Sequence, residues 1–122
     1  MKLSNNDIYM YAIKLTEAFS DESQKLPIKV NFYLQKNKNT LIDLAAHIEQ
    51  VRSEIISQYG NYDSENNGYT FTVENAEKVQ KELEDLSNLE QDVNIYTINI
   101  DNLPDDLTLT TGQMEAIMFM VE

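Results

Sequence analysis

The sequence predicts an α+β fold that is predominantly helical, with a long antiparallel helical hairpin, a small β-hairpin or strand element and a short C-terminal helix. Three observations lead to this prediction. A heptad repeat of apolar residues extends over about 27–59, and a second apolar stripe extends over about 73–89. Between them, Asn67-Gly68 has the composition of a hairpin turn. A chain of 122 residues is expected to form a single domain over 1–122.

The first element is an amphipathic helix over about 5–19. Ser4 followed by Asp7 resembles a capping box whose acid is one methylene shorter than usual. The apolar residues then follow at spacings of four, three and four: Ile8, Ala12, Leu15 and Phe19. The polar segment "SDESQK" favours a turn after this helix.

The second helix is expected to begin at Pro27, which suits a first helical turn. Its apolar residues alternate at spacings of four and three, and we call them the heptad seam: Val30, Leu34, Asn37, Leu41, Leu44, Ile48, Val51 and Ile55. Asn37 is the one polar member, and Gly60 gives a stop. A helix from Pro27 to Tyr59 would be about 50 Å long and needs packing partners along its length. The β-prone "IKVNFY" at its start leaves an extended segment as the alternative.

Three further elements follow the second helix. Alternating Tyr69, Phe71 and Val73 after Asn67-Gly68 predict a β-hairpin. The helix over about 73–89 carries an apolar face of Ala76, Val79, Leu83 and Leu86, and we expect it to pack antiparallel to the second helix. The segment "DVNIYTINI", residues 92–100, predicts a covered strand.

The last helix is expected over 111–121, after a second capping box formed by Thr110 and Gln113. The core-facing stripe is assigned to Met114, Ile117, Met118 and Val121. Phe119 and Met120 fall outside this stripe. We therefore interpret Phe119 and Met120 as a patch that faces a partner or a second copy.

The charge is distributed unevenly along the chain. The net charge is −12, and residues 61–122 carry fourteen acids against two bases, whereas residues 1–60 are balanced. From Glu82 to Asp106 there are eight acids and no base, so this segment should repel nucleic acid and membrane surfaces and attract a basic partner. The candidate partner-binding acids are Glu82, Glu84, Asp85, Glu90 and Asp92. The alternative is that the acidity serves solubility alone.

One loop fits a calcium template in part. Asp63, Glu65 and Asn67 stand at positions 1, 3 and 5 of an EF-hand loop, Gly68 at position 6 and Glu74 at position 12. Glu65 is longer than the residue usually found there, and the loop has no sister loop. The alternative is a polar hairpin tip whose residues serve turn geometry.

The sequence gives no sign of an active site. His47 is the only histidine, there is no cysteine, and no second residue completes a catalytic set with His47. We therefore expect a protein that is not an enzyme and needs no cofactor. The absence of a signal peptide or an apolar segment long enough to cross a membrane leads us to expect a cytoplasmic protein.

Taken in order, several segments resemble a known protein family. The quoted pieces are "MKLSNNDI", "KLPIKVNFYLQKN" before a long helix, "YG" before a Gly-turn hairpin, "ELEDLSNLEQDVNIYTI" and "LPDDLTLTTGQMEAIMFMVE". The chain resembles small phage and prophage proteins of unknown function from low-GC Gram-positive hosts, over essentially its whole length. The family often has a proline where Thr111 stands. The resemblance implies a phage gene and a bacterial host cell or virion, and it transfers no site residues.

Three functions follow as hypotheses. The first is a non-enzymatic interaction module, a late-gene or virion-assembly accessory protein that binds a phage structural protein or itself through helix packing. The second is an acidic, nucleic-acid-mimicking inhibitor of a basic host defence nuclease, comparable to an anti-CRISPR protein. The third is a calcium-binding helical protein. None of the three implies direct binding to nucleic acid or to a membrane.

Overall fold

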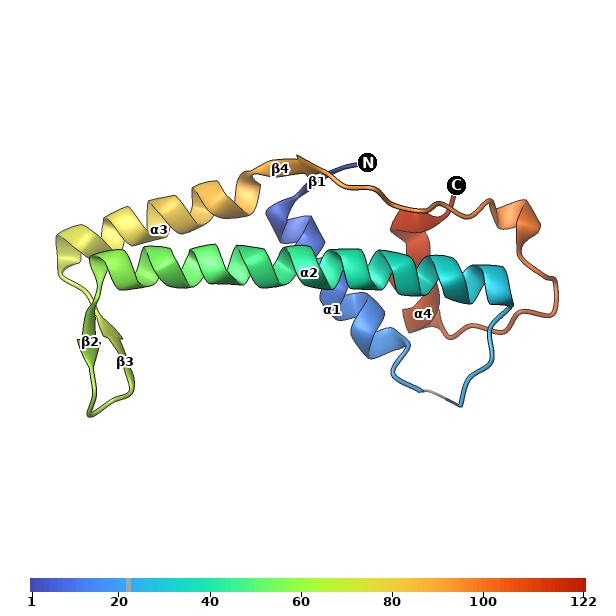
Figure 1. The fold of residues 1–122 in the computed structure, drawn as a ribbon, viewed down its shortest axis with the longest axis horizontal. Helices are drawn as coiled ribbons and strands as arrows, with labels where there is room; N and C mark the ends of the chain where they lie inside the picture. Colours follow the sequence, from blue (N-terminus) through green and yellow to red (C-terminus); the bar gives the residue numbers. More distant parts are fainter. Residues whose placement is uncertain (22) are drawn as a thin grey trace.

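The computed structural model describes residues 1–21 and 23–122 and confirms the predominantly helical α+β fold (Figure 1). The helices are α1 (Asn5–Ala18), α2 (Ile28–Tyr59), α3 (Val73–Asn88) and α4 (Thr111–Ile117), with 3₁₀ turns η1 (Ile100–Asn102) and η2 (Met118–Met120). The strands are β1 (Lys2–Ser4), β2 (Asn61–Asp63), β3 (Gly68–Thr70) and β4 (Glu90–Asp92). None of the described helices combines the length and the hydrophobicity that crossing a bilayer requires.

The helix α2 is continuous from Ile28, so the prediction of an unbroken second helix is confirmed and the extended alternative for its start is wrong. Pro27 caps its N-terminus with φ −51° and ψ 143°. At its C-terminal end the chain turns at Gly60, where a side chain would not fit. A Cβ atom there would lie 2.9 Å from the Ile56 carbonyl oxygen and 2.9 Å from the Phe71 ring.

The other helices are arranged around α2 (Figure 1). The helix α1 crosses behind its middle, and α3 runs back antiparallel along its C-terminal half, as the sequence predicts. The helix α4 packs against α1 beside the N-terminal half of α2. The core lies where α1, α4 and the first half of α2 meet: Leu3, Ile8, Ala12, Leu15, Val30, Leu34, Leu41, Val93, Ile98, Ala116, Ile117 and Met120.

The heptad seam is therefore core over only half of its length. Val30, Leu34, Asn37 and Leu41 are buried, whereas Leu44, Ile48, Val51 and Ile55 are half-buried. Leu44 and Ile48 pack against the margin of the core, and only one helix, α3, runs along the C-terminal half of α2. The first half is enclosed more fully because α1, α4 and the segment after β4 all cover it.

The sheet between β1 and β4 was not predicted. These strands pair antiparallel, with Leu3 opposite Gln91. The N-terminal amine of Met1 donates to the Val93 carbonyl oxygen (3.0 Å), and the Val93 amide donates to the Met1 carbonyl oxygen (2.8 Å). The start of α1 is thereby fixed to the end of α3.

The predicted strand over 92–100 is wrong for most of its length. The strand β4 ends at Asp92, and the residues after it are extended without a neighbouring strand. Only Ile98 makes a bridge, parallel to Val121. Val93 and Ile98 of this segment are buried in the core, whereas Tyr96 and Ile100 are exposed. Asn37 replaces the missing strand by hydrogen bonding to the backbone of Tyr96.

The hairpin between α2 and α3 is confirmed, although its strands are short. Tyr62 and Tyr69 pair across it with ring centroids 5.4 Å apart. Asn67 has φ 56°, the left-handed conformation that the turn requires and that asparagine tolerates. Beyond Thr70 the chain leaves the strand, and Thr72 caps α3.

The C-terminal helix is shorter than predicted, and its core stripe is displaced by one residue. Thr110 and Gln113 form the expected capping box, but α4 ends at Ile117 and continues as the 3₁₀ turn η2. The buried residues are Gln113, Ala116, Ile117 and Met120, whereas Met114 and Met118 are exposed. Because every residue from Ile117 to Val121 is apolar, the sequence is compatible with both the predicted and the observed core stripe. The apolar pattern alone therefore does not determine which of these residues face the core.

Candidate functional site

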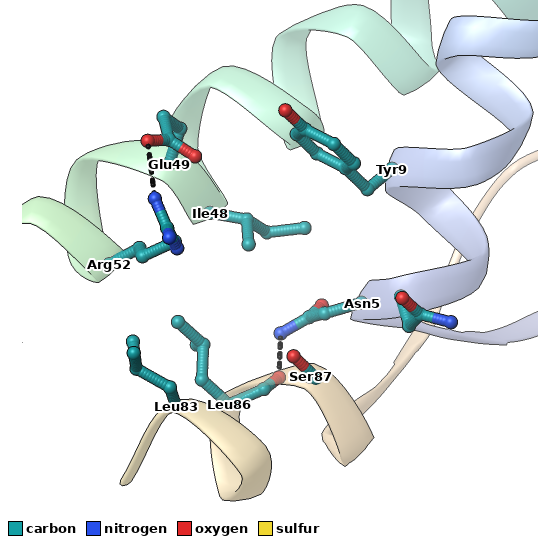
Figure 2. A pocket seen from close by; sticks show the side chains of 9 residues that line it. Asn5, Tyr9, Ile48, Glu49, Arg52, Leu83, Leu86 and Ser87 are labelled. Carbon is teal, nitrogen blue, oxygen red and sulfur yellow. Dashed lines mark hydrogen bonds and ion pairs between the residues drawn. The ribbon is translucent and has the colours of Figure 1, made fainter. Parts of the chain in front are cut away.

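One hollow of the surface lies where three helices meet. It has a volume of about 340 Å³ and is lined by residues from the first turns of α1, the second half of α2 and the end of α3 (Figure 2). The apolar part of its wall comes from Tyr9, Ile48, Leu83 and Leu86. The contributions of α1, α2 and α3 are more than 30 positions apart in the sequence, so the hollow exists only because α3 folds back beside α1.

Buried Asn5 holds this hollow together. Its side-chain Nδ2 donates to the Leu86 carbonyl oxygen (2.8 Å), and its Oδ1 accepts from Gln91 Nε2 (2.6 Å). Its backbone amide donates to the Leu89 carbonyl oxygen (2.8 Å). The polar groups of Asn5 are thus used to join α1 to the end of α3, which assigns this residue a structural role.

A second hollow, of about 550 Å³, continues along α3 and shares Arg52, Leu83 and Ser87 with the first. Phe71, Ala76 and Val79 extend its apolar wall. Arg52 lies between the two hollows, and its Nη1 is 3.3 Å from Glu49 Oε1. The two hollows form one groove between α2 and α3, and we call it the α2–α3 groove.

The α2–α3 groove offers apolar contact and little reactive chemistry. Its titratable lining residues are Tyr9, Glu49, Arg52 and Glu84, and it contains neither histidine nor cysteine. His47 is exposed on α2 and does not line it. Within residues 1–21 and 23–122, no group of three or more His, Asp or Glu side chains is placed to hold a metal ion.

Four of the five predicted partner-binding acids, all except Glu82, lie along one long edge of the molecule. The segment from α3 through β4 to η1 follows this edge past the whole first half of α2 (Figure 1). Its exposed carboxylates from the end of α3 onward are Glu84, Asp85, Glu90, Asp92 and Asp101, and we call them the acidic edge. Lys2 Nζ approaches Glu90 to 3.8 Å, with both side chains largely exposed.

Glu82 differs from its acidic neighbours because it is half-buried and directed to α2. Its Oε1 accepts a hydrogen bond from the Tyr59 hydroxyl (2.8 Å). This bond, with smaller contributions from desolvation and from the charge of Glu82, raises the pKa of Tyr59 above its usual value. Glu82 therefore joins α3 to α2 and is not part of the acidic edge. Elsewhere, hydrogen bonds from Ser23 lower the pKa of Asp21.

The residues of the proposed calcium loop are used within the hairpin. Asp63 accepts from the Glu65 amide (3.0 Å) and from Asn66 Nδ2 (2.7 Å), and Asn67 Oδ1 accepts from the Tyr62 hydroxyl (2.9 Å). Glu74 is exposed and pairs with Lys78 at 3.4 Å. Asp63 ends β2, β3 lies inside the loop, and Glu74 lies in the first turn of α3, so the loop is a β-hairpin followed by a helix and not an EF-hand loop. The structure does not bring these acids together.

The predicted partner patch at the C-terminus is wrong for Met120, which is completely buried (0% exposed). Its sulfur lies 3.4 Å from Asn37 Nδ2 in the core. Phe119 is half-buried and stacks on Tyr11, with ring centroids 4.4 Å apart and planes 8° apart. The exposed residue of η2 is instead Met118, at 64%.

Sequence reasoning missed both the α2–α3 groove and the hydrogen bonds made by Asn5. The helix lengths gave a partial signal of the groove, because the second half of the heptad seam is covered by a helix of only about four turns. Asn37 is visible in the sequence as the polar member of the heptad seam, but no local pattern identifies the backbone of Tyr96 as its partner.

No protein-family model, no curated protein and no solved structure matches this chain.

Proposed function

We propose that this protein is a non-enzymatic protein–protein interaction module that binds a basic protein surface through the acidic edge. The observation that carries the proposal is the course of the segment from α3 to η1. It distributes five exposed carboxylates along one side of an elongated molecule, and Lys2 lies near one of them. Such a field attracts a basic surface and accelerates its association.

The charge of the acidic edge also limits which classes of partner can bind. Phosphate backbones and anionic membranes are repelled by clustered carboxylates, so the partner is a protein rather than a nucleic acid. Exposed ion pairs contribute little each, about 0–1 kcal/mol. Binding through this edge therefore depends on several pairs together and weakens steeply with salt.

The resemblance to phage proteins supports a partner in an infected bacterial cell. On this basis we propose a late-gene or virion-assembly accessory role, in which the basic partner is a phage structural protein. The α2–α3 groove supports this role, because its apolar wall offers contacts that do not weaken with salt.

A second candidate is inhibition of a basic host defence nuclease by imitation of nucleic acid. The observation that favours it is the continuation of the carboxylates beyond α3 onto β4 and η1, which gives a line of charge longer than one helix. An inhibitor of this kind competes with DNA or RNA for the nuclease, whereas an assembly protein copurifies with particles.

The proposal is tested with two variants of equal charge. One replaces four acidic-edge residues: Glu84→Gln, Asp85→Asn, Glu90→Gln and Asp92→Asn. The matched control replaces four exposed acids elsewhere: Glu17→Gln, Glu65→Gln, Asp106→Asn and Glu115→Gln. We expect the first variant alone to lose affinity for the basic partner, measured by calorimetry over a series of salt concentrations. Equal loss in both variants would show that only net charge matters and would overturn the acidic edge as a site.

A further inference from the structure

The helix α2 has a second regular stripe on the side opposite the heptad seam. Its members recur at spacings of four and three over almost the whole helix, and we call them the outer stripe: Ile28, Phe32, Gln35, Asn39, Ile42, Ala46, Gln50, Ser53 and Ser57. All nine are exposed. The helix α1 crosses behind α2 in Figure 1, and within the described part of the chain no helix or strand lies in front of α2.

The composition of the outer stripe is unusual for a solvent-facing helix surface. In a chain of net charge −12 it contains no charged residue over nine positions. Ile28 is 90% exposed, and Phe32 is 52% exposed. A solvent face of a long helix normally carries charged residues, whereas an uncharged stripe with apolar members at this spacing is typical of a packing face.

Side-chain size changes from one end of the outer stripe to the other. The large residues Ile28 and Phe32 lie near the N-terminus, and the small residues Ala46, Ser53 and Ser57 lie in the C-terminal half. The Phe32 ring is held in place by an edge contact to Tyr96, with centroids 6.5 Å apart. A large, fixed side chain on one half and small ones on the other make two stripes complementary only when they run in opposite directions.

The charges that flank the outer stripe change in the same sense. From Ile28 to Ile42, α2 carries Lys29, Lys36 and Lys38 and no acid. From Asp43 to Tyr59 it carries Asp43, Glu49 and Glu54, with Arg52 as its one permanent base. An antiparallel arrangement places the basic half of one helix beside the acidic half of the other, whereas a parallel arrangement places like charges together.

We propose that the outer stripe binds a second copy of this chain, with the two α2 helices antiparallel about a two-fold axis near Ile42. In this register Ile28 lies level with Ser57 of the other copy, Phe32 with Ser53, and Asn39 with Ala46. The outer stripe maps onto itself, as a two-fold interface requires. Asp43 lies close to the two-fold axis and therefore near Asp43 of the other copy. Repulsion between these two carboxylates limits the affinity, so that dimer formation depends on the protein concentration.

This interface is separate from the acidic edge, which belongs to α3, β4 and η1. The dimer therefore does not depend on the function proposed above. A dimer built on α2 would carry two acidic edges, so a basic partner with repeated sites would bind it more tightly than a monomer by multivalency.

The first test measures self-association by sedimentation velocity over a series of protein concentrations. Ala46→Glu places a charge in the outer stripe, and Ala76→Glu makes the same substitution at an exposed position of α3. We expect dimers for the wild type and for Ala76→Glu. For Ala46→Glu we expect a loss of at least about tenfold in association, because each introduced carboxylate loses its hydration in an uncharged packing face, level with Asn39 of the other copy. Circular dichroism checks that both variants keep the wild-type helical signal.

The second test determines the orientation and uses the absence of cysteine from the chain. Under mild oxidation, Ile42→Cys alone should cross-link to itself, and a mixture of Ile28→Cys and Ser57→Cys should give the mixed dimer. Ile28→Cys alone should stay uncross-linked. A monomeric wild type, a dimer that resists Ala46→Glu, equal disruption by Ala76→Glu, or self-cross-linking of Ile28→Cys would each overturn the proposal.

Discussion

The side chain of Asn37 binds the backbone of Tyr96 with two hydrogen bonds. Its Nδ2 donates to the Tyr96 carbonyl oxygen (2.8 Å), and its Oδ1 accepts from the Tyr96 amide (2.8 Å). This is the pairing that a neighbouring strand would make. A fully buried amide in the heptad seam thereby fixes the extended segment that covers the first half of α2.

Replacing Asn37 by leucine should therefore destabilise the protein, although leucine completes the apolar heptad seam. We expect a loss of about 1–3 kcal/mol in the free energy of unfolding, because partly buried backbone groups of Tyr96 lose their partners. Asn31→Leu, at an exposed position of α2, is the control and should change it by less than about 0.5 kcal/mol. Urea unfolding measures both, and a wild-type stability for Asn37→Leu would contradict the assigned role.

The adjacent methionines of η2 should respond in opposite ways to the same substitution. Met120→Ser removes a fully buried side chain and should cost about 2–5 kcal/mol. Met118→Ser acts on an exposed side chain and should cost less than about 0.5 kcal/mol. Thermal unfolding followed by circular dichroism compares the pair. Equal effects would show that the one-residue displacement of the core stripe is incorrect.

Tyr11 and Phe119 should be energetically coupled. Their stacked rings join α1 to η2, and aromatic pairs of this kind contribute about 0.5–1.5 kcal/mol beyond the area they bury. A double-mutant cycle with Tyr11→Leu and Phe119→Leu measures this coupling from urea unfolding. In the control cycle, Tyr9→Leu replaces Tyr11→Leu. Tyr9 is also on α1 but does not stack on Phe119, so its effect should be additive with that of Phe119→Leu.

Tyr59 should titrate above the usual pKa of 10.0 for tyrosine. The protonated hydroxyl donates to Glu82, so the folded state binds this proton more tightly than the unfolded state does. The stabilisation is therefore complete below pH 10 and decreases as the pH rises through the raised pKa of Tyr59. Ultraviolet titration of wild type against Tyr59→Phe isolates this residue. In Glu82→Gln its pKa should move back toward 10.0, and an unchanged titration there would refute the role of Glu82.

The helices were predictable because their signals are local. Ser4 with Asp7 and Thr110 with Gln113 form the capping boxes that the sequence indicates, and the apolar spacing located α2 and α3 within a residue or two. In each case the residues that determine the structure lie within a few turns of each other. Local periodicity and capping therefore sufficed.

The errors arose where a distant contact decides the structure. Residues 94–97 have the composition of a strand, but none of the described strands pairs with them, and Asn37 takes that place at Tyr96. Met120 and Met118 are equally apolar, and contact with α1 and α2 determines which one is buried. The α2–α3 groove combines residues of three helices, so no short motif in the sequence describes it.

The position of β1 has a consequence for how the chain acquires its fold during synthesis. Its hydrogen-bonding partners in β4 and at Val93 are separated from it by about three-quarters of the sequence; Met1 and Val93 lie 92 positions apart. Contacts between such distant positions form slowly, because a long loop must close first. Residues 1–4 are therefore ordered only after residues near 90 have been synthesised. A nascent chain arrested before β4 should leave its N-terminus open to proteases, and one arrested beyond the C-terminal helix should protect it.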